Sequence, residues 1–326
     1  MTGVVLAGYG PVGRCFVERL PAGARPYGVP LRVSVVRGDS TQCRLGEGDP
    51  VPPRSSWEPL ESLDETLERT GARVFAQAVP SSIAGADRAA EEALVALRRG
   101  VHVVTATKSH LLSHWRTLDE TGRRHDALIR ISGATGAALP AGDLARTALR
   151  GLGCTTIRAC PNGTVTFVLD RLAAGDPLPE ALGEARRRGI AEADPSADLS
   201  GEDAATKVRL LAALCWGWDP ARVRVEAQPV DAGTAGRAYA ATAGGRRIRA
   251  VASARADQPS AVRVDLVETE PGDPLHALAG PEKAVIFGSP DAGDVVVSGG
   301  RSSPLGAALA MVKDAIEVTA PRTAFG

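Results

Sequence analysis

The first 133 residues alternate between short apolar runs and longer segments with helical spacing. The segments between the runs place apolar residues three or four positions apart, whereas the runs themselves are continuously apolar. Such runs separated by helices are typical of a parallel sheet that is covered on both faces. We therefore predict an α/β domain with strands at Val4–Ala7, Arg32–Val36, Val74–Val79, Val101–Thr105 and Leu128–Ile131, and a loop over 41–60.

The pattern changes after residue 133, where longer alternating segments follow a group of helices. Gly244-Gly245 separates two alternating segments and predicts a two-residue hairpin turn. Mixed helices and antiparallel strands indicate an α+β domain. The predicted organisation is residues 1–133, residues 134–300, and a segment 301–326 whose helix returns to the first domain. The predicted helices are 140–150, 163–174, 178–188, 201–215 and 304–318, and the alternating segments are 222–228, 239–243, 246–254 and 262–268.

Composition narrows the class of protein. The chain has 326 residues with 38 basic and 38 acidic side chains, so it carries no basic surplus for nucleic acid or an anionic membrane surface. It has no apolar run of the ~18 residues that a membrane span needs. The beginning of the chain lacks the features of a secretory signal, and the five cysteines form no CxxC pair. We expect a cytoplasmic protein with reduced thiols.

Lysine is scarce in this chain. Of the 38 basic residues only four are lysines, and the rest are arginines: Lys108, Lys207, Lys283 and Lys313. A buried lysine can release its proton, whereas an arginine in a protein cannot. A lysine retained in an arginine-rich chain is therefore a candidate for proton chemistry.

A glycine-rich loop joins the first predicted strand to the first helix. Gly8, Gly10 and Gly13 have the GxGxxG spacing, with Pro11 and Val12 opening the helix. In a dinucleotide site these glycines permit a tight turn, close approach of the backbone to a pyrophosphate, and close packing of helix on strand. The alternative, an ordinary glycine-rich turn, is less compatible with this strand–turn–helix context. The loop predicts a Rossmann-type domain that binds NAD(P).

The end of the second strand bears on the choice of cofactor. Arg37 stands where NAD sites commonly place an acid, and a guanidinium suits the 2′-phosphate of NADP. Asp39 weakens this signal, and a solvated surface charge is the alternative for Arg37. We predict that NADP(H) is preferred, with NAD(H) as the alternative cofactor.

The ends of the third and fourth strands supply further candidates. Pro80 and Ser81 follow the third strand, and Thr105 and Lys108 follow the fourth. Ligands of open α/β sheets bind at the carboxyl ends of the strands. Lys108 could instead simply open a helix, although its charge would oppose the helix dipole there. His110 and His114 lie four apart without further metal ligands, so we expect a surface pair and no metal.

Residues 189–214 contain the densest group of charges. Five acids precede Lys207, and Asp203 lies four residues before it on the same helix face. Ser200 and Asp203 resemble a capping box. One interpretation is a capped helix with an ion pair, and the other is a site that exchanges a proton. The acids are Glu192, Asp194, Asp198, Glu202 and Asp203.

Together these motifs resemble the homoserine dehydrogenase family in its short form, without a regulatory C-terminal domain. The similarity covers nearly the whole chain and is carried by GYGPVG, TATK, PNGT and EADPSADLSGEDAATK. It implies interconversion of aspartate 4-semialdehyde and L-homoserine, and a homodimer formed through the sheet of the second domain. By resemblance, Lys207 performs acid–base work with Lys108 nearby, and the remaining site residues are Glu192, Asp198, Asp203, Asn162, Gly163 and Thr164.

The substrate end departs from the family pattern. Ile190 replaces a tyrosine, Ser132 replaces a glutamate of a monovalent-cation site, and residues 299–303 replace the usual GPGAG loop. Losing a hydroxyl from a polar site can change specificity strongly. A paralogue that acts on a related small aldehyde, and a non-catalytic NADP(H)-binding regulator, are therefore alternatives. Ser132 further predicts little dependence of activity on sodium or potassium.

Overall fold

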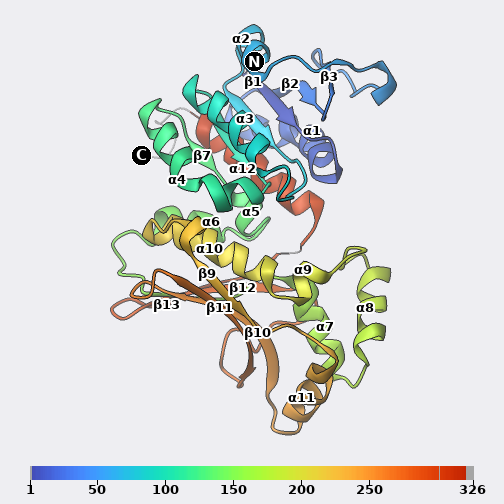
Figure 1. Ribbon diagram of the computed structural model, residues 1–326, viewed down its shortest axis with the longest axis vertical. Helices are drawn as coiled ribbons and strands as arrows, with labels where there is room; N and C mark the ends of the chain where they lie inside the picture. Colours follow the sequence, from blue (N-terminus) through green and yellow to red (C-terminus); the bar gives the residue numbers. More distant parts are fainter. Residues whose placement is uncertain (1, 301, 321–326) are drawn as a thin grey trace. The chain divides into compact units, whose positions relative to one another are not determined.

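A computed structural model describes residues 2–300 and 302–320 (Figure 1). The chain divides into two compact units. Unit 1 consists of two segments, one that ends at Ala137 and one that begins at Pro304. Unit 2 is Ala138–Ser303. Arg301 and residues 321–326, which belong to the predicted 299–303 loop and C-terminal segment, lie outside the described residues.

Unit 1 contains a sheet in the order β4-β3-β2-β1-β5-β6-β7. Strands β2, β1, β5, β6 and β7 are parallel to one another, which confirms the predicted α/β sheet. The antiparallel edge strands β3 and β4 occupy part of the predicted loop 41–60, so that prediction was wrong there. The bounds are β1 (Thr2–Ala7), β2 (Leu31–Arg37), β3 (Thr41–Arg44), β4 (Glu58–Pro59), β5 (Val74–Gln77), β6 (His102–Thr105) and β7 (Ile129–Arg130).

Helices pack on this sheet in two groups. Helix α12 lies beside α1, where Phe16 and Leu20 share a core with Met311 and Ala315 (Figure 1). Helix α3 packs against α2 and α4. The bounds are α1 (Pro11–Ala24), α2 (Leu63–Thr70), α3 (Ala86–Arg98), α4 (Ser109–Arg124), α5 (Ser132–Thr135) and α12 (Pro304–Thr319), with short 3₁₀ turns at Arg25–Tyr27 and Arg54–Ser56.

Unit 2 contains a second, largely antiparallel sheet in the order β13-β12-β8-β10-β11-β9. Helix α10 (Glu202–Trp216) covers one face, where Val208 and Leu211 pack with Val285 and Phe287. The alternate residues Ala284 and Ile286 belong to a separate cluster. The strands are β8 (Thr156–Cys160), β9 (Arg224–Ala227), β10 (Arg247–Arg255), β11 (Ala261–Thr269), β12 (Lys283–Ser289) and β13 (Gly293–Gly299).

The other helices of unit 2 complete the α+β arrangement. Helices α7, α8 and α11 share a core that includes Leu172, Ala181 and Ala238. The bounds are α6 (Ala141–Asp143), a π-helical turn Leu144–Ala148, α7 (Gly163–Ala173), α8 (Leu178–Arg187), α9 (Ser196–Leu199), a 3₁₀ turn Pro220–Arg222 and α11 (Ala232–Ala243). No helix in the described part of the chain has the length and apolarity to cross a membrane.

Three local predictions in unit 2 were wrong. The alternating segment 239–243 is the end of α11, because Asp231 and Thr234 form a capping box that starts a helix there. Gly244-Gly245 therefore follows a helix, and β10 pairs with β11 instead. Helix α10 begins after Gly201, which has φ 84° and no side-chain cap, so Ser200 and Asp203 do not form a capping box.

Candidate active site

The glycine loop of unit 1 adopts the close-packed turn that its spacing predicts. Gly8 has φ 95°, and a Cβ there would lie 2.4 Å from the carbonyl oxygen of Ala78. A Cβ at Gly13 would lie 2.1 Å from the carbonyl oxygen of Gly8. Both positions therefore require glycine, one for backbone conformation and both for close packing.

Gly10 differs from the other two glycines because the position that a Cβ would occupy faces open space. It is the N-cap of α1, and a Cβ there would meet nothing within 4 Å. Pro11 and Val12 open the helix, so the first N–H groups of α1 begin at this open side. An accessible helix N-terminus beside a residue without a side chain fits a dinucleotide pyrophosphate.

Polar contacts join the loops that follow β5 and β6. Ser81 Oγ accepts a hydrogen bond from the backbone N–H of Lys108 at 2.8 Å, and Thr107 donates to the carbonyl of Val79 at 2.8 Å. Thr105 Oγ1 accepts from the N–H of Thr107 at 3.0 Å. Lys108 is the half-buried N-cap of α4. The structure thus brings together Ser81, Thr105 and Lys108, next to the exposed Pro80.

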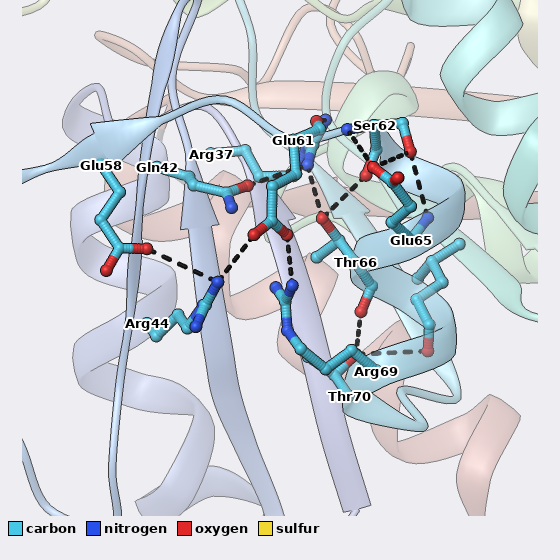
Figure 2. A network of polar contacts seen from close by, with 11 residues as sticks. Arg37, Gln42, Arg44, Glu58, Glu61, Ser62, Glu65, Thr66, Arg69 and Thr70 are labelled. Atoms are coloured by element: carbon cyan, nitrogen blue, oxygen red, sulfur yellow. Dashed lines mark hydrogen bonds and ion pairs between the residues drawn. The ribbon is translucent and has the colours of Figure 1, made fainter.

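Arg37 is a buried structural residue, and not the accessible or solvated cation that the sequence predicts. Its side chain is directed into a network with β3 and α2 (Figure 2). The guanidinium donates to Gln42 Oε1 at 3.1 Å, Thr66 Oγ1 at 2.9 Å and the carbonyl of Glu61 at 3.0 Å. Only 3% of Arg37 is exposed, and burial lowers its pKa. The assignment of Arg37 to a 2′-phosphate is therefore corrected.

Arg88 is an exposed cation near the same turn, and the sequence reasoning missed it. It lies in α3 with its side chain 53% exposed, and it donates to the carbonyl of Asp39 at 2.9 Å. Its Nε also lies 3.7 Å from Glu92. No local pattern in the sequence could have identified Arg88, because Asp39, whose carbonyl it contacts, lies 49 residues away.

His110 is buried in α4, which overturns the predicted surface pair. It has no exposed surface, and both ring nitrogens lack hydrogen-bond partners within residues 2–300 and 302–320. Burial lowers the pKa of His110 to about 4. His114 alone lies at the surface, 3.4 Å from Asp87.

Ser132 lies at the start of α5 and contacts the last helix. Its hydroxyl donates to Asp314 Oδ1 at 2.8 Å and accepts from Lys313 Nζ at 2.9 Å. Lys313 Nζ also lies 2.8 Å from Asp314 Oδ1, and Asp314 is fully buried. An ammonium group of the chain itself therefore lies against both oxygens.

In unit 2, Asn162 connects the polar residues that the sequence singled out. It caps α7 through Oδ1, which accepts from the N–H of Val165 at 3.0 Å. Its Nδ2 donates to Asp198 Oδ1 at 2.6 Å and to Asp203 Oδ2 at 2.8 Å. One side chain thus fixes the start of a helix and the positions of two carboxylates.

Lys207 lies against the same carboxylate of α10. Its Nζ is 2.6 Å from Asp203 Oδ2 and donates to the carbonyl of Pro161 at 3.0 Å. The predicted ion pair between Lys207 and Asp203 is therefore present. Since Asp203 also accepts from Asn162, the pair belongs to a larger polar cluster that the helix alone does not explain.

The first turn of α7 adds a close backbone approach and a hydroxyl. A Cβ at Gly163 would lie 2.3 Å from the carbonyl oxygen of Pro281, so only glycine fits. Thr164 donates to the carbonyl of Ile190 at 3.0 Å. Burial raises the pKa of Asp198, against the opposing effect of its hydrogen bond from Asn162.

The structure differs from the sequence predictions at Glu192 and Lys283. Glu192 is exposed, whereas Asp203 and Lys207 are half-buried. Lys283, which no motif singled out, is 2% exposed. The pKa of Lys283 is lowered to about 8, chiefly by burial and also by Lys207, while Asp203 opposes the shift. Lysine scarcity was the one signal that could have identified it.

Sequence comparisons identify similar proteins along the chain. The sequence model of homoserine dehydrogenase matches residues 140–316. Homoserine dehydrogenase of Methanocaldococcus jannaschii is 28% identical over 264 residues, 79% of this chain and 76% of that protein. The Synechocystis enzyme is 28% identical over 96% of this chain and 72% of its own length. The Corynebacterium glutamicum enzyme is 32% identical, but this chain spans 47% of its length.

Solved structures share the fold over almost the whole chain. A protein described as a homoserine dehydrogenase from Archaeoglobus fulgidus superposes with a TM-score of 0.84, covering 98% of this chain and all of that one at 23% identity. A hyperthermophilic archaeal homoserine dehydrogenase in complex with NADPH superposes with a TM-score of 0.79, covering 98% and 97% at 23% identity.

Proposed function

The chain belongs to the homoserine dehydrogenase family, and we propose that it is an NAD(P)-dependent oxidoreductase that interconverts L-homoserine and aspartate 4-semialdehyde. The observation that carries this proposal is the cluster of Asn162, Asp198, Asp203 and Lys207 in unit 2. It combines carboxylates for a substrate ammonium with a lysine for a substrate oxygen. The glycine loop of unit 1 supports the dinucleotide part of the proposal.

Lys207 is the proposed proton donor in the direction of aldehyde reduction. An ammonium has three N–H donors, and the contacts with Asp203 and Pro161 use two of them. The third has no acceptor among residues 2–300 and 302–320, and we assign it to a substrate oxygen. The bound nicotinamide supplies the hydride. Lys207 stabilises the negative charge that develops on the oxygen and gives up a proton to it, while Asp203 holds the amine in place.

Carboxylates at the same end suit an amino-acid substrate. Asp198 and Asp203 are half-buried beside Asn162, and the proposed substrate brings an ammonium that pairs with such acids. Glu192 joins this role only if it moves from its exposed position. Lys108 of unit 1 keeps the assisting role that the resemblance implies. Ile190 offers only its carbonyl to Thr164, which keeps a related small aldehyde as the alternative substrate.

Cofactor choice, assembly and location complete the proposal. Gly10 and the start of α1 hold the pyrophosphate, and Arg88 replaces Arg37 as the cation proposed for a 2′-phosphate. We retain the preference for NADP(H), with NAD(H) as the alternative. A homodimer in the cytoplasm is also proposed. The exposed Val267 and Val296 on the second sheet and the free thiols of the five cysteines support it.

The direct test is turnover by the purified protein. L-Homoserine oxidation with NADP⁺ and NAD⁺, followed by nicotinamide absorbance, is expected to proceed, and Lys207→Ala is expected to lower kcat by ~10²–10⁴-fold. Light scattering in the same preparation measures the oligomeric state. Absence of turnover with homoserine and with a panel of amino-acid alcohols and semialdehydes contradicts the enzymatic proposal and favours the non-catalytic regulator.

A further inference from the structure

Cys154 and Cys215 are two half-buried thiols of unit 2 that the proposed function does not use. Cys154 lies just before β8, and Cys215 is in the last turn of α10. Both pack against the core that α10 forms with the second sheet. Two cysteines from distant parts of the sequence therefore lie at the edge of one core.

Helix α10 is held beside β8 at both ends. Near the start of the helix, Lys207 donates to the carbonyl of Pro161, the residue that follows β8. At the end of the helix, the indole N–H of Trp216 donates to the carbonyl of Cys154 at 2.9 Å, across 62 residues of sequence. The helix and the strand therefore run in opposite directions, and the backbone of Cys154 is fixed beside the neighbour of Cys215.

The two thiol groups interact directly. A hydrogen bond joins the side chains of Cys154 and Cys215, and it lowers the pKa of Cys154 while it raises the pKa of Cys215. The Cys154 thiol also contacts the carbonyl oxygen of Thr156 at 3.5 Å. A lowered pKa, partial exposure and a second thiol alongside are properties typical of redox-sensitive cysteines.

The backbone near each cysteine can adjust to a new covalent bond. Gly153 precedes Cys154 with φ 63°, and Gly217 follows α10 with φ 71°. Residues 151–153 are also exposed, so no packing restrains them. Glycine accepts changes of φ and ψ that other residues resist. The two sulfurs can therefore adopt the specific geometry of a disulfide without a change in the core.

We propose that Cys154 and Cys215 form an oxidation site, at which a peroxide converts the two thiols into a disulfide that joins the end of α10 to the segment before β8. The inference goes beyond the proposed function and does not depend on it. In the proposed cytoplasmic location such a disulfide is transient and responds to oxidant. It adds a covalent link to the helix that carries Lys207.

The reaction has two steps and needs no reagent other than the peroxide. The Cys154 thiolate attacks one oxygen of hydrogen peroxide, the O–O bond breaks, and the departing hydroxide takes up a proton, so Cys154 becomes a sulfenic acid. The sulfur of Cys215 then loses its proton and attacks the sulfur of Cys154, and the S–O bond breaks with release of water. Two thiols are oxidised to one disulfide, and one peroxide is reduced to two molecules of water.

The test treats the purified, reduced protein with hydrogen peroxide and maps its disulfides by mass spectrometry. Each chain is expected to lose two hydrogen atoms and to yield a linked pair of peptides with Cys154 and Cys215, and dithiothreitol should reverse both changes. Because the bond closes a loop of roughly 60 residues, the Tm of the oxidised protein is expected to rise by about 5–10 °C. An unchanged or lowered Tm would show that the bond does not fit the native fold, and would contradict the proposal.

Single variants identify the cysteine that reacts first. In Cys215→Ser the sulfenic acid on Cys154 has no second thiol beside it, so it is expected to be trapped by dimedone. In Cys154→Ser the thiol of Cys215 is expected to remain reduced. Cys15→Ser is the matched control, because Cys15 is a half-buried thiol of unit 1, and it is expected to form the disulfide as the wild type does.

Folding of each variant is checked by thermal melting, and an alanine variant replaces any serine variant that does not fold. Oxidation in denaturant, where the fold no longer holds the thiols together, is expected to give mixed pairings. The proposal is overturned if native protein forms a bond between two chains or through another cysteine, or if Cys154 and Cys215 both stay reduced.

Discussion

Two regions of this molecule bury cations at the end of a strand, and they do so differently. At the end of β2, Arg37 donates to three uncharged acceptors of its own unit, in a network that includes α2 (Figure 2). At the corner of β8 and β12, Lys207 Nζ lies 2.6 Å from Asp203 Oδ2, and Lys283 interacts electrostatically with both residues. The acceptors of the first cation are uncharged, and its Nε has no hydrogen-bond partner among the described residues, whereas Lys207 in the second region pairs with a carboxylate.

The contrast follows from the chemistry of the two side chains. Guanidinium has a fixed fork of donors and keeps its proton, so it suits a permanent link between elements. Arg249 is used in the same way, 1% exposed and bonded to Asp170 and nearby carbonyls. Lysine amines lose their proton more readily on burial. Buried arginines therefore link elements of the fold in this chain, while Lys207 belongs to the cluster that we propose for the reaction.

Arg37→Leu is expected to have the largest effect on stability. The change leaves the buried acceptors of Gln42 and Thr66 without their donor, so the free energy of unfolding should fall by about 3 kcal/mol. Arg88→Leu is the matched control, because its exposed side chain contributes at most ~1 kcal/mol. Denaturant unfolding measures both values.

The same pair separates folding from cofactor choice. Arg88→Leu is expected to lower the preference for NADPH over NADH, while folded Arg37→Leu keeps it. A loss of NADPH preference in Arg37→Leu with unchanged stability would reverse these assignments and return Arg37 to the cofactor site.

His110 predicts a smaller, pH-dependent effect in unit 1. Its pKa is about 4 in the folded protein and ~6.5 when unfolded. The unfolded state binds more protons between these values, so the stability present above pH ~6.5 is lost as pH falls through about 4. The total is at most about 3 kcal/mol, from 1.36 kcal/mol per pKa unit.

The measurement is the free energy of unfolding between pH 7 and 4 in the wild type, His110→Leu and His114→Leu. The His110 variant is expected to lose part of this slope, and the His114 variant to retain it because His114 is near the surface. Equal slopes in all three proteins would show that His110 does not govern the acid response.

Cation dependence is the smallest expected effect. Lys313 Nζ lies against Ser132 and Asp314, so the wild type is expected to have similar activity in sodium, potassium and tetramethylammonium chloride at one ionic strength. In Lys313→Met the two oxygens lose this ammonium, and activity is expected to respond to sodium or potassium by a few-fold. Strong, saturable activation of the wild type would contradict the interpretation.

Local signals made much of the fold predictable. The glycines from Gly8 to Gly13 determine the turn between the first strand and the first helix. Asp203 and Lys207 are four residues apart, so they share a helix face wherever that helix lies. The end of α11 was misread, because alternation over five residues resembles a strand. Its start depends on Asp231 and Thr234, which a short window around 239–243 does not include.

The environments of the site residues depend on contacts between residues that are distant in sequence. The buried Arg37 donates a hydrogen bond to Thr66, 29 residues away in sequence. Asp203 accepts one from Asn162, 41 residues away. Lys283 is level with Pro161 only because β12 pairs with β8. No periodicity near these residues records such partners, so the residue types were visible in the sequence while their environments were not.

The most direct test of the account is kcat of Lys207→Arg with L-homoserine and NADP⁺. This variant keeps a positive charge near Asp203 but cannot readily release a proton. We predict that kcat falls by ~10²-fold or more while NADP⁺ binding is unchanged. Nearly full activity in Lys207→Arg would show that charge alone suffices, and would contradict the claim that a lysine of unit 2 transfers the proton.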